Sequence, residues 1–103
     1  MTIDEFCTEV EISINKTGRH PSLNVKNAFA NNVRWYDKYQ NTCPITFLAN
    51  YKFRDRTYRL DDFRLAGKRL GLDEFSINKI MMAADYQKED MDLILRKRML
   101  SWV

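Results

Sequence analysis

The sequence predicts a mainly α-helical protein, a compact single domain of four to six helices over residues 1–103. A chain of this length can bury one ordinary core without staples. Only three glycines and two prolines are present, which leaves little material for the tight turns of a β-sandwich or barrel. Most segments also repeat their apolar residues at helical spacing. The hydrophobic fraction of 45% and charged fraction of 30% are typical of a folded chain.

The first predicted helix covers residues 3–16. Thr2 and Glu5 have the T-x-x-E spacing of a capping box, which satisfies backbone N–H groups at a helix start. The residues that follow on one helical face are Ile3, Phe6, Cys7, Val10 and Ile14. The alternation of Val10, Ile12 and Ile14 with polar residues is also typical of a strand. The second half of this segment therefore stays open between helix and strand.

A break at residues 16–22 separates this element from the next. Gly18 can close a helix, and Pro21 disfavours helical backbone at His20. Ser22 or Asn24 can cap a helix that runs to about Gln40. Its apolar face consists of Val25, Ala28, Phe29, Val33, Tyr36 and Tyr39.

The apolar residues within positions 45–59 fit both the spacing of a helix and the alternation of a strand. Pro44 suits the first position of a helix, and Ile45 and Leu48 continue one helical face. The alternative is a short β-hairpin, in which alternating residues 45–53 pair with residues 57–59. A helix is favoured because the only strand available as a partner is very short.

Residues 60–82 (LDDFRLAGKRLGLDEFSINKIMM) predict two short helices joined by a turn at Gly71. The first, from Asp61 to Leu70, is acidic at its start and basic at its end, as the helix dipole favours. Its apolar set is Leu60, Phe63, Leu65, Ala66 and Leu70. Asp73 is a suitable cap for the second helix, which reaches about residue 84. Its inward or partly inward residues are Phe75, Ile77, Ile80, Met81 and Ala84.

A last helix is predicted to open at residues 88–90 and to carry basic residues 96–98 near its end. Its expected apolar side consists of Met91, Ile94, Leu95, Met99 and Trp102. It is expected to pack across the preceding pair of helices.

The spacing within residues 60–82 resembles that of the helix-turn-helix superfamily of DNA-binding proteins. Two helices that cross closely need small residues late in the first helix and a glycine at the turn, which Ala66, Gly67 and Gly71 supply. The apolar positions of such a unit are filled by Leu70, Leu72, Ile77 and Ile80. The resemblance covers about a fifth of the chain and selects no particular family.

This resemblance implies that the exposed side of the second helix enters the major groove of DNA. Ser76, Asn78 and Lys79 are then the candidates for base contact, with Phe75 and Met82 as apolar contacts. The candidates for phosphate contact are Arg59, Arg64, Lys68 and Arg69. Asp73 and Glu74 depart from the pattern, because two carboxylates at the helix tip would face phosphates.

The same stretch is also similar to the helical C-terminal lobe of HipA-type toxin kinases. The similarity rests on Tyr58, Leu60, the pairs Asp62-Phe63 and Leu65-Ala66, the run at residues 70–72, and Ile77, Ile80 and Ile94. No phosphate-binding loop or catalytic aspartate motif accompanies it. The similarity therefore implies a free-standing helical module without phosphotransfer.

The charge is unevenly placed. Residues 51–103 hold 12 basic and 9 acidic residues, which accounts for the whole net charge of +3. Cys7 and Cys43 are isolated and have no metal or redox spacing, so we expect reduced thiols in a cytoplasmic protein. We expect no membrane partner, because no apolar run approaches the roughly 20 residues that span a bilayer. His20 is the only histidine, and no catalytic, metal or cofactor motif is evident.

Together these features predict a small non-enzymatic binding protein. The leading expectation is a regulator that binds double-stranded DNA as a homodimer, since two-fold pairing doubles the few base contacts of one unit. The alternative is an accessory or inhibitor module that docks on a protein partner. One version of this alternative is that the module occupies the partner's nucleic-acid site. The modest basic excess is compatible with both.

Overall fold

A computed structural model describes residues 1–23, 43–53, 63–85 and 92–102. It contains five α-helices in this order: α1 (Ile3–Thr17), α2 (Pro44–Phe53), α3 (Phe63–Arg69), α4 (Glu74–Asp85) and α5 (Leu93–Leu100). The predicted mainly α-helical class is therefore confirmed, and the described residues contain no strand. The helix expected at residues 22–40 falls almost entirely outside the described residues.

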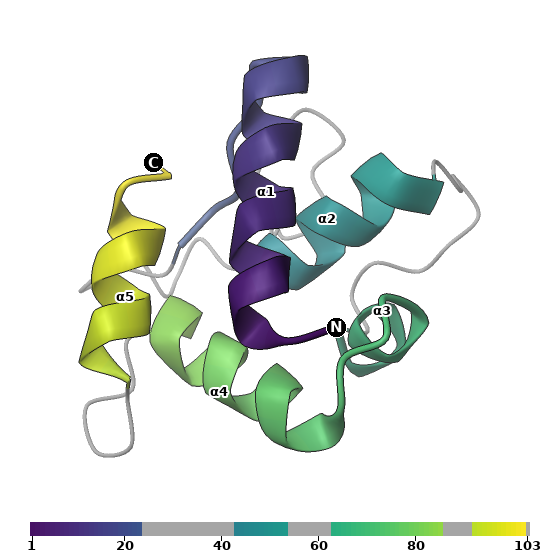
Figure 1. Ribbon diagram of the computed structural model, residues 1–103, viewed down its shortest axis with the longest axis vertical. Coiled ribbons are helices and arrows are strands. Elements are labelled where there is room, and N and C mark those ends of the chain that lie inside the picture. Colours follow the sequence, from purple (N-terminus) through teal and green to yellow (C-terminus); the bar gives the residue numbers. More distant parts are fainter. Residues whose placement is uncertain (24–42, 54–62, 86–91, 103) are drawn as a thin grey trace.

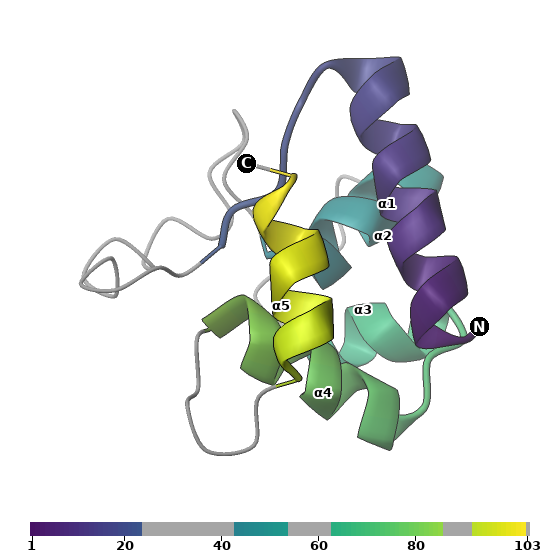
Figure 2. The same ribbon diagram turned by 60° about the vertical axis from the view of Figure 1, so that its left-hand side comes forward.

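The helices pack around one core (Figure 1). In this view α1 runs along the long axis of the molecule, with α5 on one side, α2 on the other and α4 across the lower end. The turned view in Figure 2 keeps α4 and α5 side by side. Within the described ranges, no helix is long and apolar enough to cross a membrane.

Helix α1 begins at the predicted capping box. Thr2 Oγ1 accepts from the backbone N–H of Glu5 (3.0 Å), and Glu5 Oε1 accepts from the backbone N–H of Thr2 (2.7 Å). Gly18 closes the helix with φ of 71° and donates to the carbonyl of Ile14 (2.8 Å). The helical alternative is thus confirmed for the whole segment, and its buried apolar residues are Phe6, Cys7 and Val10.

Residues 45–53 belong to helix α2, so the helical alternative is confirmed for this segment. Pro44 occupies its first position, where the absent N–H has no intrahelical partner to lose. Every residue from position 44 to 49 is buried, so α2 is the central helix of the core. A helix buried on all sides has no apolar stripe, which is why its sequence resembled a strand. Residues 57–59, the expected hairpin partner, lie outside the described residues.

Helices α3 and α4 form the predicted pair joined at Gly71. Gly71 has φ of 88°, and its N–H donates to the carbonyl of Lys68 (3.0 Å). The N–H of Leu72 donates to the carbonyl of Gly67 (2.9 Å), which completes a Schellman motif. In Figure 1 α3 is seen nearly end-on while α4 lies across the view, so their axes cross steeply.

Gly67 is the point of closest approach between these two helices. A Cβ atom built at Gly67 would lie 2.5 Å from Ile77 Cγ1 and 3.7 Å from Ile45 Cγ2. Only a residue without a side chain therefore lets α4 pack onto α3 over α2. The predicted apolar positions Leu70, Leu72, Ile77 and Ile80 are all buried in this core.

Three expectations about inward-facing residues are wrong. Leu65 on α3 is 51% exposed, Phe75 on α4 is 70% exposed and Ile94 on α5 is 85% exposed. Phe75 faces outward because it precedes the buried Ile77 by two residues, about 200° around a helix. Helix α5 also begins later than expected, at Leu93, because Asp92 Oδ1 caps it by accepting from the N–H groups of Ile94 and Leu95.

Arg98 joins the C-terminal helix to the N-terminal one. Its guanidinium donates two hydrogen bonds to Glu11 (both 2.9 Å) and one to Asp4 Oδ1 (2.8 Å). Trp102 Nε1 also donates to Glu11 (2.9 Å), and His20 Nδ1–H donates to the carbonyl of Trp102 (2.5 Å). The hydrogen bond from Arg98 lowers the pKa of Glu11, so the carboxylate stays ionised in this network.

We predict that Gly67→Ala destabilises the fold by about 1–3 kcal/mol, because the new methyl overlaps Ile77. Urea unfolding followed by circular dichroism measures this change. The sign is diagnostic, since Gly to Ala in an uncrowded helix would stabilise by about 0.5–1 kcal/mol. Combining it with Ile77→Ala should relieve the overlap, so the two costs should be less than additive. Equal or greater stability of Gly67→Ala alone would contradict the close approach.

Candidate interaction surface on α4 and α5

The residues expected to contact bases lie on α4 but differ in availability. Asn78 is exposed, whereas Ser76 and Lys79 are half-buried. The backbone N–H of Ser76 donates to Asp73 Oδ1 (2.7 Å), so Asp73 caps α4 as predicted. This hydrogen bond lowers the pKa of Asp73, which fixes a negative charge at the tip of the helix.

Lys79 connects α4 to the start of α5. Its Nζ atom lies 3.8 Å from Asp92 Oδ2 and 5.4 Å from the centre of the Phe75 ring. The ammonium thus lies between an aromatic face and a carboxylate, both of which attract it. Lys79 therefore has two partners inside the protein, and a base edge would have to compete with them.

Large exposed apolar side chains occur on both of the helices that this contact joins. Phe75 is 70% exposed, Leu93 70% and Ile94 85%, although all three belong to well-formed helices. The outward side of α5 continues with the exposed Lys97 and Leu100. We refer to Phe75, Lys79, Leu93, Ile94, Lys97 and Leu100 as the α4–α5 surface.

Arg96 decides which side of α5 faces the core. Its side chain is buried, and its Nη1 donates to the carbonyls of Ala83 (2.9 Å) and Ala84 (3.1 Å) in the last turn of α4. A cation at a helix C-terminus is favourable, because the last carbonyls have no intrahelical partner. Leu95, Met99 and Trp102 are buried on the same side. The opposite side is therefore centred on Lys97, with Leu93 and Leu100 on one flank and Ile94 on the other.

Sequence reasoning missed this surface because α5 carries apolar and basic residues all around its circumference. Its periodicity therefore selects no face. A weak signal was the run of three aliphatic residues at positions 93–95, since one helical face cannot bury all three. Neither Arg96 nor the Lys79–Asp92 contact is signalled by spacing.

The phosphate-contact candidates on α3 are exposed, whereas Arg59 lies outside the described residues. Arg64 stacks on Phe63, with its guanidinium 5.2 Å from the ring centre, and Arg69 stacks on Phe53 at 4.5 Å. Lys68 is exposed between them. The structure thus brings Arg64, Lys68 and Arg69 together on one short helix.

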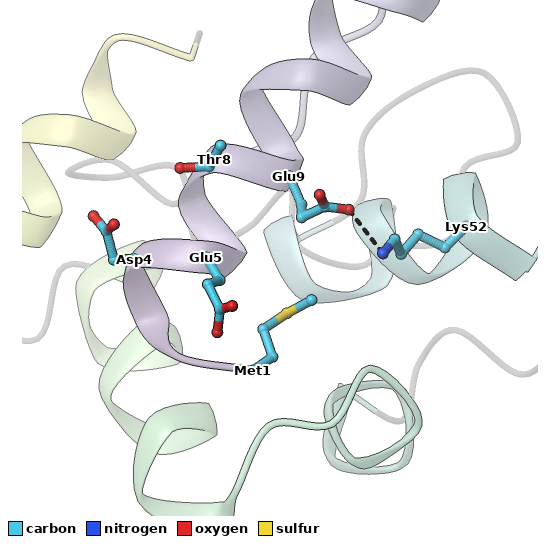
Figure 3. A pocket seen from close by; sticks show the side chains of 6 residues that line it. All are labelled: Met1, Asp4, Glu5, Thr8, Glu9 and Lys52. Atoms are coloured by element: carbon cyan, nitrogen blue, oxygen red, sulfur yellow. Dashed lines mark ion pairs between the residues drawn. The ribbon is translucent and has the colours of Figure 1, made fainter.

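A shallow depression of about 370 Å³ lies between α1 and α2 (Figure 3). Its lining residues are Met1, Asp4, Glu5, Thr8, Glu9 and Lys52. The carboxylates are already engaged: Glu9 pairs with Lys52 (2.7 Å), Asp4 with Arg98, and Glu5 belongs to the capping box. The depression therefore offers no carboxylate without a partner for a cation.

Neither cysteine is activated as a nucleophile, and the described residues contain no metal site. Burial raises the pKa of the Cys7 thiol to about 11, and burial also raises the pKa of Cys43, so both stay protonated near neutral pH. Within the ranges that the structure describes, no group of three or more His, Cys, Asp or Glu residues could hold a metal ion.

Comparison with models of known protein families gives no match, and neither do comparisons with curated proteins and with solved structures.

We predict that Asp85→Asn stabilises the protein at pH 7. Burial raises the pKa of Asp85, at the end of α4, from 3.8 to about 6, although Arg96 opposes the shift. The folded state therefore favours the neutral acid. This contribution is complete below pH 3.8 and is lost as the pH rises through about 6.

The expected gain in unfolding free energy at pH 7 is on the order of 3 kcal/mol as an upper bound, and it should vanish near pH 3.5. Urea unfolding at both pH values measures it. Asp73→Asn is the matched control, because the lowered pKa of Asp73 gives the opposite sign. An Asp85→Asn variant no more stable than the wild type at pH 7 would contradict burial of this carboxylate.

Proposed function

We propose that this protein is a non-enzymatic binding module whose α4–α5 surface docks on a protein partner. The observation that carries the proposal is the exposure of three large apolar side chains on two helices that contact each other, Phe75 on α4 and Leu93 and Ile94 on α5. Exposed apolar residues scattered singly are ordinary on protein surfaces, but a group of them is typical of an interaction site. Burying each such side chain contributes about 1.5–3 kcal/mol.

The chemistry of this surface suits a protein better than DNA. The cores of protein interfaces are rich in aromatic and apolar residues and poor in charge. A groove of DNA instead requires polar side chains facing base edges and cations facing phosphates. Here the tip of α4 carries the carboxylates of Asp73 and Glu74, and Lys79 already has partners.

A selection from a phage-displayed library of random peptides tests the proposal. The peptides should be about 15 residues long, enough for about four helical turns. We expect the selected peptides to lose at least about tenfold in affinity for Ile94→Lys and for Phe75→Lys, which is about 1.4 kcal/mol or more of interface energy. Fluorescence anisotropy of each labelled peptide measures the affinities.

Ile12→Lys on α1 is the matched control, since Ile12 is also an exposed aliphatic residue but belongs to another helix. Circular dichroism checks that each variant is folded, which we expect because Ile94 and Phe75 contribute little buried surface. The proposal fails if no peptide is selected, or if the selected peptides bind Ile94→Lys and wild type equally.

DNA binding through the α3–α4 unit is the second candidate. Two observations favour it: the tight crossing at Gly67 and the exposed cations Arg64, Lys68 and Arg69 beside the turn. These cations on α3 can contact phosphates beside α4, leaving Asn78 for a base edge.

For this candidate we predict micromolar binding to random duplex DNA that weakens steeply as salt is raised, because phosphate contacts release counterions. Lys68→Ala should weaken binding to all sequences alike, whereas Asn78→Ala should relax sequence preference. Anisotropy of a labelled duplex in a salt titration measures both effects. Absence of binding even at low salt would remove DNA from consideration.

A further inference from the structure

The outward side of α5, which is part of the α4–α5 surface, has a positive charge at its centre. Lys97 lies on the outward side of α5, with Leu93 and Leu100 on one flank and Ile94 on the other, and it is exposed. Among the residues that the structure describes, Lys97 forms no ion pair. The basic neighbours on either side are used inside the protein, Arg96 at the end of α4 and Arg98 on α1.

We infer that the partner presents an amphipathic helix whose apolar side carries a carboxylate opposite Lys97. This inference rests on the proposed protein-docking function and names the class of partner. The partner's aliphatic residues would cover Leu93, Ile94 and Leu100, and its Asp or Glu would pair with the ammonium that this contact desolvates. A lysine covered by apolar groups without such a partner would be strongly disfavoured.

The shape of the surface favours a helix. Leu93 and Leu100 are seven positions apart and lie on one line along α5, whereas Ile94 lies across Lys97 from them, so these residues and Lys97 form a broad stripe over two turns. A second helix can lie along such a stripe, because its own side chains at i, i+3, i+4 and i+7 form the matching ridge. A peptide that bound by adding a β-strand would need an open sheet edge, and the described part of the chain contains no strand.

A second copy of this chain fits the same stripe poorly. In a two-fold contact the residue at the centre faces its own counterpart. Pairing two α5 helices along the full stripe would therefore bring Lys97 against Lys97, with no carboxylate between them. Like charges that lose water in this way repel, whereas a partner carboxylate attracts.

Two designed helical peptides test the inference. Both place leucines at i, i+3 and i+7, and they differ only in whether glutamate or lysine lies within the apolar stripe at i+4. Anisotropy of the labelled peptides with the full chain should show at least about tenfold tighter binding of the glutamate peptide at low salt. The preference should shrink as salt is added. Lys97→Glu should reverse it.

Lys68→Glu is the matched control, because it changes the net charge equally but lies on α3. It should leave the preference intact, which separates pairing with Lys97 from general attraction to a basic protein. Equal binding of both peptides, lost in Ile94→Lys, would overturn the acidic partner while leaving the docking function standing.

If neither peptide binds, the acidic helix is overturned, and the docking function is then judged by the library selection alone. The remaining possible occupant is a second copy of this chain, and analytical ultracentrifugation at increasing protein concentration tests whether a dimer forms. A dimer that Ile94→Lys abolishes would overturn the inference in favour of a second copy.

Discussion

The close approach of α4 to α3 at Gly67 is the constraint on which the rest of the arrangement depends. Ile77 fills the space that a side chain at position 67 would take, and Ile45 of α2 closes the same contact from the other side. Because the Schellman turn at Gly71 sets the direction in which α4 leaves α3, one local motif fixes three helices relative to one another. Helices α1 and α5 add their own buried apolar residues to this core and are joined to each other by polar contacts.

Helix α5 is held by two arginines as well as by its buried residues Leu95, Met99 and Trp102. Arg96 binds the carbonyls at the end of α4, and Arg98 binds the carboxylates of α1. These two anchors fix both the position and the rotation of a helix only eight residues long. Because Leu95 and Met99 are buried together with Arg96, Leu93 and Ile94 lie on the side of α5 that faces water. The exposure of Leu93 and Ile94 thus follows from the way in which α5 is held on the core.

Local signals in the sequence predicted the local structure well. The capping box at Thr2, the turn at Gly71 and the cap at Asp73 depend on residues a few positions apart, so their spacing is visible in the chain. The orientation of α5 depends on Arg98 and Glu11, which are 87 positions apart, and no periodicity reports such a pair. The same limit explains why Phe75 was expected inside: α4 shows an apolar face, but only its packing shows where that face ends.

The same difference between local signals and long-range contacts applies to the candidate site. Sequence spacing located Asn78, Lys79 and the α3 cations, but it could not show that Lys79 is drawn to Asp92 and Phe75. That contact changes the character of α4, because Lys79 serves to join two helices. A helix expected to present polar groups to bases instead exposes the large aromatic side chain of Phe75. Lys97 remains as the exposed cation of the α4–α5 surface without an ion pair in the described ranges, and its charge is therefore the feature by which a partner would be selected.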